Sequence, residues 1–160
     1  MKSKPQLPPL DLREVLVITP AGHPLFASKI VKTDKSIVYD PRTQLTIIEE
    51  ACMCYGSDIK GRIQAIAKLT GNRQYLNPVL VREWQLTVMQ PSMNYRSPEC
   101  IWVNIRNITK DSTIICTKKA YHIHSNEGEL IIPLKESLQS KMKATMYEII
   151  ERLLFPRLLY

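Results

Sequence analysis

The chain has 160 residues, 44% of them hydrophobic, which suffices for the core of one domain and is short for two. Its 22 lysines and arginines outnumber the 15 aspartates and glutamates, and the resulting +7 charge favours a polyanionic partner if it gathers on one face. No apolar run approaches the roughly 18 residues that span a bilayer, which excludes a transmembrane protein, and no signal-peptide pattern opens the chain.

The first ten residues hold three prolines and two lysines, a composition that does not form a regular strand or helix. We expect residues 1–10 to be a flexible leader and residues 11–160 to be a single domain. β-Branched runs then predict strands at residues 13–19, 27–33 and 36–39, the first two joined by a turn rich in proline and glycine.

Residues 46–71 contain the firmest helix signals. Thr46 and Glu49 have the capping-box spacing, so Thr46 is the expected N-cap of a first helix that ends at Gly56. Apolar residues at helical spacing follow it, and Ser57 or Asp58 is expected to cap a second helix that ends at Gly71. These patterns predict a pair of short helices in the middle of the chain.

The second half alternates like antiparallel strands, which we expect at residues 77–83, 85–89, 101–108, 113–117, 121–125 and 129–134. In residues 101–108, the alternation places Trp102, Asn104 and Arg106 on the exposed face. Gly128 suits the hairpin between the last two strands. From Ser137 on, apolar residues recur at helical spacing up to the stop at residues 155–156, which predicts an amphipathic helix.

The predicted fold is therefore α+β, with antiparallel strands, a central short helix pair and a C-terminal amphipathic helix. Met142 and Met146 lie in the apolar stripe of that last helix, and we assign them to the core. The same stripe could in part serve a dimer.

Metal binding and catalysis find little support. Cys52 and Cys54 lie about 200° apart around a helix and cannot chelate one ion. His122 and His124 share a strand face without a second ligand pair at a recognisable spacing. The chain has no nucleophile elbow and no glycine-rich phosphate loop. We expect no enzyme, no metal and no cofactor, and the unpatterned cysteines indicate reduced thiols in the cytoplasm.

The basic residues are the better functional candidates. Four of them are close together in sequence and three others could join the same face: Lys60, Arg62, Lys68, Arg73, Arg96, Lys118 and Lys119. An ordinary solvated helix face remains an equal interpretation of this charge. Aromatic residues are few, which disfavours stacking on single strands, so duplex DNA or another acidic surface fits better.

Several blocks of the chain, in this order, resemble one known family. They are residues 28–31, the run EEACMCYGSDIKGRIQAIAKLTG (residues 49–71), residues 77–81, residues 98–103 and the hairpin SNEGELIIPL (residues 125–134). Together they are similar to the ComK family of competence transcription factors of Firmicutes. The matched family positions include Gly56, Ser57, Gly61, Arg62 and residues 69–71.

The resemblance implies a cytoplasmic transcription activator that binds AT-rich promoter boxes, largely through the minor groove, as a dimer or higher assembly. It also implies a partner adaptor that delivers the protein to a Clp protease. A DNA contact by Arg62 is inferred from its charge and position. The alternative function is a protein-interaction or adaptor module whose basic face meets an acidic protein.

Overall fold

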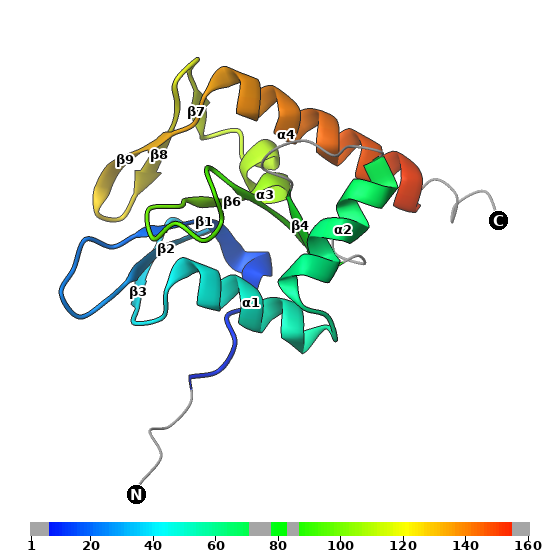
Figure 1. Ribbon diagram of the computed structural model, residues 1–160. Helices are drawn as coiled ribbons and strands as arrows, with labels where there is room; N and C mark the ends of the chain where they lie inside the picture. The colour runs from blue at the N-terminus through cyan, green and yellow to red at the C-terminus, as the bar shows by residue number, and fades with distance from the viewer. Residues whose placement is uncertain (1–6, 71–77, 83–86, 155–160) are drawn as a thin grey trace, which may run out of the picture.

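The computed structural model describes residues 7–70, 78–82 and 87–154 of the chain. Among them, the larger sheet has the order β3-β2-β1-β6-β5-β4, and the smaller sheet has the order β7-β8-β9 (Figure 1). Every pair of neighbouring strands is antiparallel. The predicted α+β class, with its central helix pair and C-terminal helix, is confirmed.

The larger sheet consists of β1 (Val15–Pro20), β2 (Ser28–Lys32), β3 (Ile37–Asp40), β4 (Val79–Arg82), β5 (Thr87–Pro91) and β6 (Trp102–Asn104). The smaller sheet consists of β7 (Ile115–Cys116), β8 (Ala120–Ser125) and β9 (Gly128–Pro133). The helical elements are η1 (Leu12–Glu14), α1 (Gln44–Cys54), α2 (Ile59–Thr70), α3 (Ile105–Lys110), α4 (Glu136–Ile149) and the π-helical turn η2 (Ile150–Leu154).

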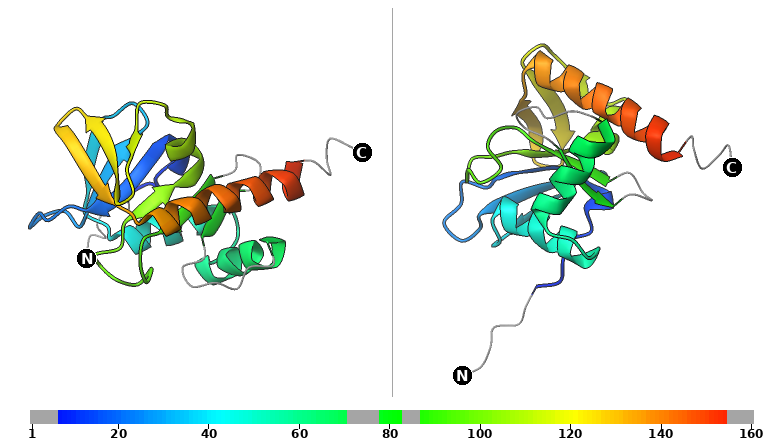
Figure 2. Two further views of the ribbon diagram at one scale, coloured as in Figure 1. Left: turned by 90° about the horizontal axis from the view of Figure 1, so that it is seen from above. Right: turned by 45° about the vertical axis from the view of Figure 1, so that its right-hand side comes forward.

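The inner strands β1, β5 and β6 of the larger sheet are buried on both faces over most of their length. Helix α1 covers one face, and α3, α4 and the smaller sheet cover the other (Figures 1 and 2). The pleat sorts the side chains accordingly: Ile18 and its neighbours in β2 and β6 face α1, while Val17 and its neighbours face the smaller sheet. Helix α2 contributes to the cores on both faces of the larger sheet. Ile59 packs in the core under α1, and Ile66 packs in the core shared with α3, α4 and the smaller sheet. The helix therefore covers the edge strand β4.

The predicted strand over residues 101–108 is wrong beyond Asn104. The strand β6 ends there, and the Asn104 side chain accepts a hydrogen bond from the Asn107 amide at 3.2 Å, which caps α3. Trp102 and Asn104 are buried, with exposures of 0% and 2%, because β6 lies between β1 and β5 with both faces covered. The alternation that suggested an exposed face came from a polar helix cap.

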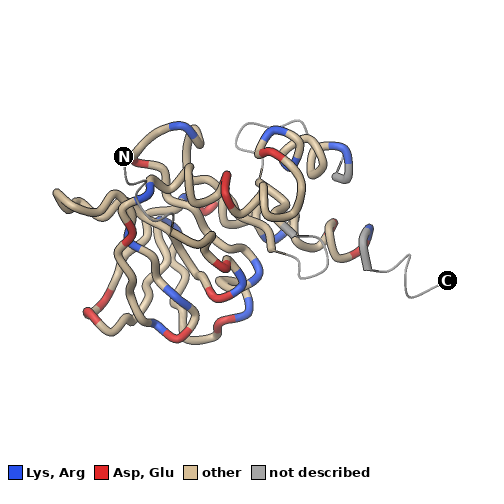
Figure 3. The backbone as a smooth tube through the Cα atoms, turned by 90° about the horizontal axis from the view of Figure 1, so that it is seen from below, with Lys and Arg blue, Asp and Glu red and all other residues tan. Residues whose placement is uncertain are grey.

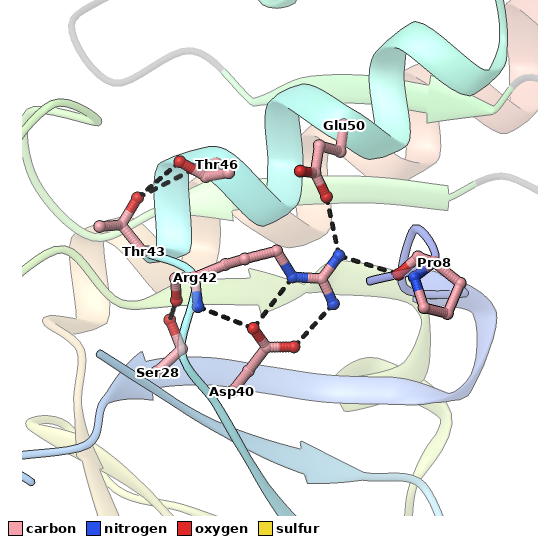
Figure 4. A network of polar contacts seen from close by, with 7 residues as sticks. All are labelled: Pro8, Ser28, Asp40, Arg42, Thr43, Thr46 and Glu50. Atoms are coloured by element: carbon pink, nitrogen blue, oxygen red, sulfur yellow. Dashed lines mark hydrogen bonds and ion pairs between the residues drawn. The ribbon is translucent and has the colours of Figure 1, made fainter. Parts of the chain in front are cut away.

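The start of α1 also differs from the prediction. Thr43 is the N-cap and accepts a hydrogen bond from the Thr46 amide at 3.2 Å, so Thr46 lies within the first turn (Figure 4). The left-handed turn at Gly56, with φ of +78°, is confirmed.

Asp58 is the residue that caps α2, because its Oδ1 accepts a hydrogen bond from the Gly61 amide at 2.7 Å. A Cβ at Gly61 would lie 2.8 Å from Ser57 Oγ and 3.1 Å from Asp58 Oδ1, so a larger residue at this position requires these side chains to shift.

The C-terminal predictions are confirmed within the described residues. Gly128 has φ of +106° in the β8–β9 hairpin, and Met142 and Met146 are buried in the core under α4. The predicted stop at residues 155–156 lies outside the described residues, as do Gly71 and most of residues 1–10. Within the part of the chain that the structure describes, no helix combines the length and the apolar character that crossing a membrane requires.

Candidate nucleic-acid interface

Helix α2 presents a polar stripe to solvent. Lys60, Gln64 and Lys68 recur every four residues and are exposed, because the apolar residues between them turn toward β4 and the two cores. Asp58 is the one acidic residue between Ser57 and Thr70, and its carboxylate is occupied by the helix cap. The stripe is therefore a cationic surface on a covered sheet edge.

Arg62 lies on the same helix, but its side chain binds the backbone at the end of α1. Its Nη2 donates a hydrogen bond of 2.7 Å to the carbonyl oxygen of Tyr55, the C-cap residue of α1. The last carbonyls of a helix carry partial negative charge, so this cation is favoured there. Arg62 is half-buried, and its Nε makes no hydrogen bond within the described residues. The structure thus places Arg62 at the corner between α1 and α2.

Arg96 lies at the opposite end of α1, in the β5–β6 loop. The loop is fixed to the first turn of α1 by the buried Gln44, whose Nε2 donates to the carbonyl oxygens of Pro98 at 2.8 Å and Cys100 at 3.1 Å. Arg96 is exposed, and its guanidinium carbon lies 5.5 Å from the centroid of the Tyr95 ring. It is a cation held over an aromatic face.

Lys118 and Lys119 lie in the β7–β8 connection and are exposed. Their carbonyl oxygens accept hydrogen bonds of 2.9 Å from the amides of Glu136 and Leu134, which places them beside the start of α4. Helix α2 lies beside the other end of α4 (Figures 1 and 2). Arg73 lies outside the described residues.

The predicted basic residues are therefore not brought onto one surface. Lys60 and Lys68 share a stripe, Arg96 lies at another end of the molecule, and Lys118 and Lys119 form a third group. Figure 3 shows lysines and arginines distributed around the chain with acidic residues between them. Helical spacing in the sequence is enough to predict the stripe on α2. The positions of Arg96, Lys118 and Lys119 relative to that stripe depend on contacts between distant parts of the sequence.

Arg42 forms a charge network that the sequence did not suggest (Figure 4). Its guanidinium pairs with both oxygens of Asp40 at 2.9 and 2.7 Å, with Glu50 at 2.7 Å and with the Pro8 carbonyl at 2.9 Å. The Arg42 side chain is 13% exposed, so its charge is unavailable to a phosphate. The network joins β3, α1 and the segment before η1.

This network also sets the protonation state of Asp40. Burial alone would raise the pKa of the carboxyl, but the hydrogen bonds and charge of Arg42 outweigh it and lower the pKa below its usual range. Both charges are therefore present at neutral pH, each compensated by the other.

The buried cysteines are packing residues. Burial raises the pKa of the Cys52 thiol to about 11 and also raises the pKa of Cys100, so both stay protonated and weakly nucleophilic at neutral pH. Within the described residues, no group of three or more His, Cys, Asp or Glu side chains is arranged to hold a metal ion. His122 instead contacts Glu129, with 3.0 Å between Nδ1 and Oε1.

Comparison with known proteins gives one family match and one distant relative. The sequence model of the family described as "ComK protein" matches residues 12–151. A mitochondrial inner membrane magnesium transporter, MRS2 of Debaryomyces hansenii, is 27% identical in an alignment over 150 residues that covers 86% of this chain. The chain spans about a third of that relative, 32% of its length. No solved structure matches.

Proposed function

The chain belongs to the ComK family, and on that premise we propose that it is a DNA-binding transcription activator of the competence regulon type. It binds AT-rich promoter boxes, largely through the minor groove, as a homo-oligomer in the cytoplasm. An adaptor of a Clp protease is a further partner on this proposal. At 27% identity over 32% of its length, the magnesium transporter does not support transport by this chain.

The observation that carries DNA binding is the exposed stripe of Lys60, Gln64 and Lys68 on α2. Lysines that neutralise phosphates release condensed counterions, which gives affinity without base contacts. A narrow A-tract minor groove has an enhanced negative potential and attracts cations, so AT preference arises from DNA shape. The partly buried Arg62 helps to position the helix that carries the stripe, through its hydrogen bond to the carbonyl oxygen of Tyr55.

A gel-shift titration with AT-rich and GC-rich duplexes at moderate salt tests the proposal. We expect tighter binding to the AT-rich duplex, weakened by the double variant Lys60→Ala/Lys68→Ala. The matched control is Lys143→Ala, because Lys143 is an exposed lysine on α4. Equal, weak and fully salt-abolished binding to both duplexes would contradict DNA recognition and favour an acidic protein as the partner.

A further inference from the structure

The β1–β2 connection, residues 21–27, projects from the larger sheet beyond neighbouring elements (Figures 1 and 2). Its tip holds His23, Pro24 and Leu25, all exposed. Leu25 is 74% exposed, among the largest values for an apolar side chain in the described part of the chain. The segment contains no Lys, Arg, Asp or Glu, so the projection has an uncharged, apolar tip.

Hydrogen bonds and ring contacts order the projection. The Ala21 amide donates to the Ala27 carbonyl at 3.0 Å, and the Leu25 amide donates to Nδ1 of His23 at 3.0 Å. The Phe26 ring packs against two others, with centroid distances of 5.1 Å to His23 and 5.9 Å to Tyr39. A preorganised tip loses little conformational entropy on binding. Its exposed leucine is therefore held ready for a partner.

The same end of the sheet carries the Arg96 loop. Strand β1 ends at Pro20, and β6 begins at Trp102, opposite Ile18 of β1, so the two connections leave the sheet side by side. Within the described residues, neither Lys29 in β2 nor Arg96 forms an ion pair.

Acidic residues also lie near this end of the sheet. Asp40 is matched by Arg42, and Glu127 accepts a hydrogen bond from the Tyr39 hydroxyl at 3.2 Å. Glu99 is exposed in the Arg96 loop. Lys29 and Arg96 are therefore cations of the elements at this end of the sheet, and Glu99 and Glu127 are the acids there that form no ion pair within the described residues.

We propose that Pro24 and Leu25 form a wedge that inserts between base pairs from the minor groove of an AT-rich duplex, with Arg96 on the adjacent phosphates. Apolar wedges of proline and leucine unstack a base step and kink DNA by about 20–90°. TA steps, which AT-rich boxes supply, unstack readily. A stable protein interface needs about 800 Å² on each partner, whereas a wedge needs one side chain. This inference rests on the proposed DNA binding, and it adds bending and a second contact region at the end of the molecule away from the α2 stripe.

The test uses a short AT-rich duplex with a single TA step, a donor and an acceptor dye at its ends, and in a second version a fluorescent adenine analogue in that step. Wild-type protein, Leu25→Ala and Ile131→Ala are titrated against both. Ile131 is the matched control because it is an aliphatic side chain, 61% exposed, on β9. Since both side chains are exposed, both variants should fold.

We expect wild type and Ile131→Ala to bring the duplex ends together and to brighten the analogue, and Leu25→Ala to lose both signals with an affinity about tenfold lower. Binding by all three proteins with the same bend, or with none, would overturn the wedge while leaving DNA binding intact. A wild-type protein that does not bind the duplex would overturn both proposals.

Discussion

The Nη2 atom of Arg62 donates a 2.7 Å hydrogen bond to the carbonyl oxygen of Tyr55 and thereby closes the corner between α1 and α2. Arg62, which the sequence predicts as a DNA contact, therefore also stabilises the junction between the two helices. Its removal should change the orientation of the helix that carries Lys60 and Lys68.

Arg62→Ala should therefore lower the free energy of unfolding by about 1 kcal/mol, the net value of a typical hydrogen bond. Lys60→Ala, which removes an exposed side chain of the same helix, should change it by less than about 0.5 kcal/mol. Denaturant unfolding measures both. Weaker DNA binding by Arg62→Ala with unchanged stability would instead make the guanidinium a direct contact.

The lysine stripe predicts a specific salt response. The logarithm of the DNA affinity should fall linearly with the logarithm of the salt concentration, with a slope of about −0.9 per neutralised phosphate. Lys60→Ala and Lys68→Ala should each make the slope shallower by about that amount, as measured by fluorescence anisotropy. An unchanged slope in both variants would remove α2 from the interface.

The Arg42 network predicts a stability loss. Arg42→Met leaves Asp40 and Glu50 without their shared cation, so the free energy of unfolding should fall by about 3 kcal/mol. Arg13→Met is the control, because the Arg13–Asp11 pair is exposed and screened by solvent, so its loss should lower the stability much less. Equal effects of the two substitutions would contradict a special role for Arg42.

The same network predicts a dependence on pH. The pKa of Asp40 is lower in the folded protein than in the unfolded chain, so its ionisation stabilises the fold above its ordinary pKa of about 4. This contribution is lost as the pH falls through the folded pKa. The stability difference between wild type and Arg42→Met should therefore shrink below about pH 4, measured by urea unfolding at a series of pH values. A difference that stays constant with pH would contradict this coupling.

Gln44 predicts a local dynamic effect. Gln44→Ala removes both hydrogen bonds that attach the β5–β6 loop to α1. Hydrogen exchange should accelerate in peptides covering residues 92–101 and stay unchanged in the β8–β9 hairpin. Because Arg96 is carried by that loop, DNA affinity should also fall. Unchanged exchange in the loop would show that other contacts hold it.

The cysteines predict two reactivity classes. Cys54 and Cys116 are exposed and should react with a thiol reagent in the native protein. Cys52 and Cys100 are buried and have raised pKa values, about 11 for Cys52, so they should react only after unfolding. Mass spectrometry of native and denatured samples counts both classes. Four equally fast thiols would contradict the packing of α1.

Local patterns predicted the elements better than their limits. Helical spacing and Gly56 identified α1, but Thr43 and Thr46 are both suitable caps, and only the preceding turn decides between them. The segment after Asn104 alternates like a strand although it folds as α3. The signal in the sequence is Asn104, a residue type that caps helices. Its side-chain oxygen accepts a hydrogen bond from the backbone N–H of Asn107, three residues later.

The candidate site was harder to predict because charge does not fix location. No local pattern in the sequence distinguishes Arg42 from a surface cation, yet Asp40, Glu50 and Pro8 together surround it. Charge alone groups Lys118 and Arg96 with α2, and the fold separates them. Leu25 carries no charge, and the prolines and glycine around it predict only a turn.

The position of β6 between β1 and β5 has a consequence for how the molecule forms. The hairpins before it, β1–β2–β3 and β4–β5, are local in sequence, but only a strand that begins at Trp102 joins them. During synthesis, β1 and β5 each keep one unpaired edge until β6 has left the ribosome. Such non-local pairing slows folding and exposes sheet edges. The newly made chain is therefore most vulnerable to aggregation and proteolysis before its central strand arrives.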